Sequence, residues 1–224
     1  MFKGVEALVF DLDDTLYPET DFVLSGFAAV GEYIREQLGL EIFPELKERF
    51  LRGERGDLFT PTLAKYMAVD EDFIRTLVDV YRRHTPMIHL YEDAAAVLAA
   101  YSQVKKLGLI TDGWLEVQKR KVKALGIEGY FDAIIYSDQF GREFWKPHPK
   151  PFEECRALLS TDFSAMIYIA DNPTKDFIAP KLLGMGTIRI LRKDGIYVNE
   201  SMESSSGQAD MTIKDLRQLY ALVT

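Results

Sequence analysis

The sequence has little of what disulfide scaffolds, histidine-rich metal sites or membrane spans require. Cys155 is its one cysteine, so no disulfide can form within the chain, and its three histidines lack metal-site spacing. The formal net charge of −8 argues against sequence-independent binding to nucleic acid or anionic lipid. No apolar run approaches the ~20 residues of a membrane span, and Asp11 interrupts the first such run too early for a signal peptide. We therefore expect a cytoplasmic protein with no nucleic-acid partner and no membrane attachment.

Short apolar runs alternate with amphipathic segments over most of the chain. Buried strands are expected at residues 7–10, 107–110, 133–136, 166–170 and 187–191. Helices are expected at residues 91–101, 115–125, 151–159, 175–183 and 213–222. Residues 119–123, which contain four basic side chains, are interpreted as a solvated helix face. The alternation predicts an α/β fold, a Rossmann-like parallel sheet with helices on both faces.

Between the first two expected strands, the alternation gives way to helical patterns alone. Helices are expected at residues 27–38, 45–51, 62–67 and 71–84. This stretch is too long for a plain crossover, so we expect a small α-helical domain over residues 18–89. The α/β core would then comprise residues 1–17 and 90–224. Residues 200–208, which contain serine and glycine, predict a mobile surface loop.

Polar side chains directly follow three of the expected strands. They are Asp11, Asp13 and Asp14 after the first strand, Thr111 and Asp112 after the second, and Asp171 after the fourth. In a parallel sheet these positions share the carboxyl edge, where ligands bind at the point of strand-order reversal. Helix capping could explain any one of them alone, but it does not easily explain the set. Nor does it explain Lys146, a cation in the Pro-rich segment WKPHPKPF.

Four short motifs, in this order, resemble those of the haloacid dehalogenase-like (HAD) hydrolase superfamily. DLDDTL is similar to the first motif, D-x-D-x-T, and ITDG is similar to the second. Lys146 in KPHPKPF matches the third motif, and ADNPTKDF, with Asp171 and Asp176, resembles the fourth. The glycine usual before that first acid is Ala170 here. The chain is thereby identified as a member of the phosphatase branch with a helical cap domain inserted after the first motif.

This resemblance implies chemistry through an aspartyl-phosphate. Asp11 would be the nucleophile, and Asp13 would protonate the leaving oxygen and later accept a proton from water. The implied cofactor is Mg²⁺, which prefers hard oxygen ligands. Its implied ligands are Asp11, the backbone carbonyl of Asp13, and Asp171. A bound cation would offset the repulsion among the three acidic side chains of DLDD.

The resemblance also implies which groups bind the phosphoryl oxygens. Thr111 would donate its hydroxyl and Asp112 its backbone N–H. Lys146 would neutralise negative charge on Asp11 and on the phosphoryl group. Asp176 is expected near the metal, where it would hold Lys146.

Three further polar residues near these motifs have expected roles. Thr15 would orient Asp13 or a nearby backbone group, or serve as a turn hydroxyl. Asn172 would either donate a hydrogen bond at the edge of the site or cap a helix. Asp14 is interpreted as a turn or cap residue, because the family tolerates glycine at its position.

The predicted function is a Mg²⁺-dependent phosphatase that acts on a small phosphorylated metabolite. A 2-haloacid dehalogenase is one alternative, but it needs no leaving-group acid, and Asp13 is present. A phosphomutase retains both aspartates and stays open. A non-catalytic phosphate-binding or signalling module is the alternative outside enzymes, and the helical insertion argues against a receiver domain.

Overall fold

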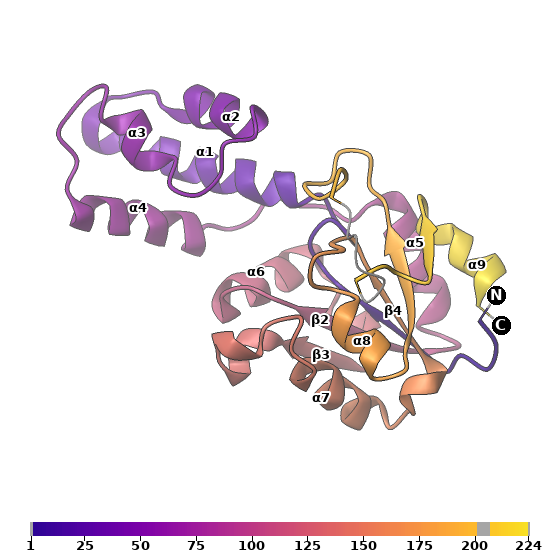
Figure 1. The fold of residues 1–224 in the computed structure, drawn as a ribbon. Coiled ribbons are helices and arrows are strands. Elements are labelled where there is room, and N and C mark those ends of the chain that lie inside the picture. Colours follow the sequence, from indigo (N-terminus) through magenta and orange to yellow (C-terminus); the bar gives the residue numbers. More distant parts are fainter. Residues whose placement is uncertain (1, 201–206, 224) are drawn as a thin grey trace. The chain divides into compact units, whose positions relative to one another are not determined.

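The computed structural model describes residues 2–200 and 207–223, and its chain divides into two compact units (Figure 1). One unit comprises Met1–Glu19 and Ile88–Thr224 and contains a β-sheet with its helices. The other, Thr20–Met87, is helical. Of the surface loop expected at residues 200–208, residues 201–206 lie outside the described part of the chain.

The α/β unit is built on a parallel six-stranded sheet, which confirms the predicted fold class. Its strands are β1 (Ala7–Phe10), β2 (Lys106–Thr111), β3 (Ala133–Tyr136), β4 (Met166–Ala170), β5 (Gly186–Ile190) and β6 (Met211–Ile213). They lie in the order β3-β2-β1-β4-β5-β6, and every neighbouring pair is parallel. The chain runs outward from β1 to β3, then returns to the other side of β1 for β4. Because crossovers between parallel strands are right-handed as a rule, this order is expected to put helices on both faces, and it makes the β1–β4 boundary the switch point where ligands bind in such sheets.

Each helix of this unit buries residues of one side in the interior. The helices are α5 (Glu92–Tyr101), α6 (Leu115–Leu125), α7 (Lys150–Leu159), α8 (Ile178–Leu182) and α9 (Leu219–Leu222). Phe152 and Cys155 of α7 belong to one buried cluster with Ala7 and Val9 of β1. α6 ends at Leu125 and is capped by Gly126, whose φ of 66° is the left-handed conformation that glycine adopts most readily.

Two expected helices differ from the structure near the end of the chain. α8 begins at Ile178, not at residue 175, because the preceding residues form a turn around Asn172. The helix expected at residues 213–222 is wrong in its first half, since β6 pairs with β5 and a 3₁₀ turn follows at Leu216–Gln218. Ile213, Leu216 and Leu219 are all buried, and their three-residue spacing predicts a helix although Ile213 belongs to a short strand.

A glycine in β2 sets how closely α7 approaches the sheet. A Cβ on Gly108 would lie 2.7 Å from Cys155 Sγ and 3.3 Å from a methyl carbon of Leu159. We expect Gly108→Ala to lower the free energy of unfolding by about 1–3 kcal/mol through overpacking. Denaturant unfolding would measure the change. Gly129→Ala is the matched control, because its Cβ would meet nothing within 4 Å. If the free energy of unfolding of Gly108→Ala equalled that of the wild type, the neighbouring side chains would have moved aside without a loss of stability.

The helical unit packs its helices around aromatic rings. Its helices are α1 (Glu19–Leu38), α2 (Phe43–Leu51), α3 (Phe59–Leu63) and α4 (Glu71–Arg83). The ring of Phe27 lies 6.0 Å from Phe50, 6.1 Å from Phe59 and 5.9 Å from Tyr81, centroid to centroid. Aromatic pairs at these distances contribute beyond their buried area, so this cluster gives the unit a core of its own. Among the described residues, none of the helices is both long and apolar enough to cross a membrane.

Candidate active site

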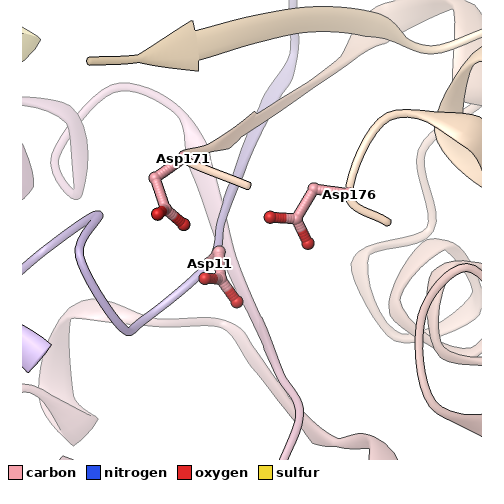
Figure 2. A group of neighbouring side chains, drawn as sticks. All are labelled: Asp11, Asp171 and Asp176. Carbon is pink, nitrogen blue, oxygen red and sulfur yellow. The ribbon is translucent and has the colours of Figure 1, made fainter. Parts of the chain in front are cut away.

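The strand register brings two distant aspartates to the same edge of the sheet. Phe10 of β1 pairs with Ile169 of β4, and the Asp11 N–H donates to the Ile169 carbonyl at 2.9 Å. Asp171 is the first residue after β4, so both acids leave the sheet side by side. Asp176 joins them from the loop that follows, and one carboxylate oxygen of each acid lies within 4.8 Å of the others (Figure 2). Residues at three sequence positions thus form one buried acidic group.

The carboxyl groups of Asp11 and Asp171 are costly to ionise in this buried acidic group. Burial raises the pKa of Asp11 to about 7, against the lowering effect of Lys146. Burial also raises the pKa of Asp171 well above its usual value, and the charges of Asp176 and Asp11 add to it. A bound divalent cation would relieve this repulsion, and carboxylate oxygens are the donors that Mg²⁺ prefers. The residues present therefore fit a magnesium ion.

Lys146 supplies a fully buried positive charge beside the acidic group. Its ammonium nitrogen lies 2.5 Å from Asp11 Oδ1 and 2.8 Å from Asp176 Oδ1, and it donates to Tyr168 Oη at 2.9 Å. The lysine side chain is fully buried. Burial alone would lower its pKa, but Asp11 and Asp176 hold that pKa well above its usual value. Lys146 is therefore an ammonium ion that bridges the first and fourth motifs.

Asp112 ties together loops from three motifs. Its Oδ1 accepts the backbone N–H of Lys146 at 3.2 Å, and its Oδ2 lies 2.9 Å from Lys175 Nζ. Burial opposes ionisation of Asp112, but Lys146 and Lys175 hold its pKa below the usual value. Thr111, the last residue of β2, is buried beside it. Lys175 belongs to the same constellation, although sequence reasoning gave it no role.

Three side chains surround the carboxylate of Asp13. Lys121 Nζ lies 2.7 Å from Oδ1, Gln118 Nε2 donates to Oδ2 at 3.0 Å, and Tyr17 donates its hydroxyl to Oδ1. Burial would raise the pKa of Asp13, but Lys121 and these hydrogen bonds hold it below its usual value. The interpretation of residues 119–123 as a solvated face is wrong at Lys121, because its side chain is only 6% exposed.

The remaining expected residues lie close to the site in different roles. The Thr15 hydroxyl is buried and has no hydrogen-bond partner among the described residues, so other side chains orient Asp13. Asn172 Oδ1 accepts from both the N–H and the hydroxyl of Thr174, as in a capped turn. Asp14 has a φ of 49° and accepts the backbone N–H groups of Glu19 and Ile196. Asp14 is therefore a buried turn residue whose oxygens are already used.

Known proteins resemble this chain over nearly its whole length. The family model for haloacid dehalogenase-like hydrolases matches residues 8–190. A glyceraldehyde 3-phosphate phosphatase from Methanocaldococcus jannaschii is 31% identical over 237 residues, which cover 100% of this chain and 97% of the relative. Pyrophosphatase PpaX from Halalkalibacterium halodurans is 25% identical over 195 residues, 82% of each chain.

Solved structures share the fold at lower sequence identity. The crystal structure of a 2-haloacid dehalogenase from Pseudomonas syringae superposes with a TM-score of 0.67 at 23% identity, covering 97% of both chains. Because unrelated chemistries share this scaffold, the reaction has to be argued from the side chains of this chain.

Proposed function

Because this chain belongs to the family of haloacid dehalogenase-like hydrolases and is a phosphatase of that family, we propose that it hydrolyses a small phosphorylated metabolite through an aspartyl-phosphate. The observation that carries this proposal is the meeting of Asp11, Asp171 and Asp176 at the switch point of the sheet, where Lys146 pairs with Asp11 and Asp176. One nucleophile, one cation and a group of oxygen ligands are what transfer of a phosphoryl group requires.

In the first step, Asp11 attacks phosphorus and the bond from phosphorus to the ester oxygen breaks. Because Lys121 favours the carboxylate form of Asp13, Asp13 takes up a proton as the anionic ester binds, and that proton goes to the departing oxygen. An alcohol leaves and an acyl phosphate remains on Asp11. Lys146 and the Thr111 hydroxyl, with the backbone N–H of Asp112, stabilise the charge on the phosphoryl oxygens. The burial of Lys146 supports this role, because a charge acts strongly where water is excluded.

In the second step, water attacks the acyl phosphate and Asp13 accepts its proton. Phosphate leaves, Asp11 is a carboxylate again, and Asp13 is ready to act as an acid. Mg²⁺ bound by Asp11, Asp171 and the backbone carbonyl of Asp13 would neutralise charge on the phosphoryl group. Asp176 would hold Lys146 in both steps, which their 2.8 Å contact supports.

We further propose that residues 18–89 are the cap domain of the family and that residues 1–17 and 90–224 are its core. The net charge of −8 and the single cysteine favour a cytoplasmic enzyme without a nucleic-acid partner. Asp13 disfavours a 2-haloacid dehalogenase, since a halide leaves without a proton. A phosphomutase would use the same two aspartates and is separated from a phosphatase by the assay below.

A panel of phosphorylated small metabolites, assayed for released phosphate, tests the proposed function. We expect phosphate release from at least one of them with Mg²⁺, and a loss of about 100-fold in excess chelator that Mg²⁺ reverses. The loss reflects carboxylates that repel phosphate when no cation separates them. Undiminished release in chelator would contradict the metal's role, and isomerised sugar phosphate without free phosphate would identify a phosphomutase.

A further inference from the structure

Helix α6 places two polar side chains in the interior of the α/β unit. Gln118 is 1% exposed and Lys121 is 5% exposed, and their spacing of three residues puts them on one face of the helix. Lys119, between them in sequence, has a side chain that is 48% exposed. A buried lysine is costly unless a carboxylate compensates it, so its position calls for an explanation beyond packing.

The compensating group is Asp13, which lies 108 residues away in sequence. Lys121 contacts one of its carboxylate oxygens at 2.7 Å and Gln118 donates to the other at 3.0 Å. Because separate donors hold the two oxygens, the carboxyl plane of Asp13 cannot turn without breaking a contact. The pair therefore fixes both the position and the orientation of this carboxyl group.

Gln118 links Asp13 to the second motif as well. Its Nε2 lies 2.5 Å from Thr111 Oγ1 and also contacts the carbonyl of Asp112, so its two hydrogens are shared among these two oxygens and Asp13 Oδ2. Since Thr111 accepts from Gln118, its own hydroxyl hydrogen is left for another acceptor. Gly113 makes room for this arrangement, because a Cβ there would lie 3.1 Å from Gln118 Cδ and its φ is +125°. The amide thus sits between the two groups expected to meet the substrate.

We propose that Lys121 and Gln118 are positioning residues that hold Asp13 where the leaving oxygen departs. The inference rests on the proposed phosphatase function and names two residues of this chain that serve its first step. A poor leaving group, such as an alkoxide, needs a well-placed acid, whereas an acyl phosphate releases a carboxylate without one. Loss of positioning must therefore harm the two substrates unequally.

The test compares kcat/KM for an alkyl phosphate and for acetyl phosphate in the wild-type protein and in Lys121→Met. For each substrate, kcat/KM reports phosphoryl transfer to Asp11 and not the later hydrolysis step, which is the same for both substrates. We expect a loss of about 30-fold with the alkyl phosphate and less than about 3-fold with acetyl phosphate. Lys119→Met, on the same helix, should change neither. Lys121→Gln serves as a second variant if the methionine protein does not fold.

A double-mutant cycle separates positioning from a structural effect. If Lys121 acts through Asp13, adding Lys121→Met to Asp13→Asn should cost nothing further with the alkyl phosphate. Equal losses with both substrates, or losses that multiply in the double variant, would overturn the inference. A wild-type protein that releases no phosphate from either substrate or from the metabolite panel would instead overturn the proposed function.

Discussion

Replacing Asp11 with asparagine is expected to lower kcat for a phosphate monoester by at least about 10⁴-fold with the fold intact. The amide has nearly the size of the carboxyl group but lacks the carboxylate oxygen proposed to attack phosphorus. Lys146 keeps its contact with Asp176 at 2.8 Å, so no buried ammonium is left without a counter-ion. Phosphate release and thermal unfolding, measured on one preparation, check both parts of this expectation.

Asp14→Asn is the matched control, since it changes a neighbouring acid of the same motif. Its φ of 49° suits asparagine, and its two oxygens accept the backbone N–H groups of Glu19 and Ile196. One of these hydrogen bonds is lost, so we expect a cost of about 1–2 kcal/mol in stability and near-normal turnover. Full activity in a folded Asp11→Asn protein would refute Asp11 as the nucleophile.

The sequence was sufficient to predict the sheet edge that carries the candidate site. β1, β3 and β4 have the predicted bounds, because buried strands of a parallel sheet are continuous apolar runs that are easy to recognise. The pairing register of the strands then determines which residues lie side by side. Asp11 follows β1 and Asp171 follows β4, and these two strands are neighbours. Their closeness is thus a consequence of topology and required no knowledge of individual side chains.

Lys121 was missed because its partner is distant in sequence and its neighbours are basic. In a run such as KRKVK, the composition predicts that all the basic side chains are exposed to solvent. Which lysine is buried depends on the orientation of the helix about its own axis. A usable signal was present nonetheless. Leu115, Gln118, Val122 and Leu125 follow helical spacing on one side of α6, and Lys121 lies beside that stripe. A polar residue on the apolar side of a helix indicates that it has a buried polar partner elsewhere in the chain.

The hydroxyl of Thr15 shows a different limit of sequence reasoning. A motif states which residue types recur, but the backbone conformation of the turn decides where each side chain reaches. Here the backbone of Thr15 is engaged, since its carbonyl accepts from Arg192 at 2.7 Å. Arg192 also pairs with Asp93 at 2.7 Å in the interior. Such long-range contacts leave no local pattern in the sequence.

Lys146→Met is expected to lower kcat/KM by about 10³-fold, because it removes the fully buried charge beside Asp11, the proposed nucleophile. It should also destabilise the protein. Lys146 is the ammonium within 2.8 Å of both Asp11 and Asp176, and Asp171 is close to both. Breaking a buried ion pair by removing one partner typically costs about 3–5 kcal/mol. Denaturant unfolding in chelator measures this loss.

Adding Mg²⁺ distinguishes the charge deficit from a packing defect in Lys146→Met. A cation bound by the acidic group would relieve carboxylate repulsion, so Mg²⁺ should stabilise the variant more than it stabilises the wild type. A cavity left by the ammonium group would not respond to the ion. Lys150→Met is the matched control, because that lysine is partly exposed and pairs with Glu154 on its own helix. If, in chelator, Lys146→Met had the same midpoint denaturant concentration as the wild type, the charge of Lys146 would make no contribution to the stability of this site.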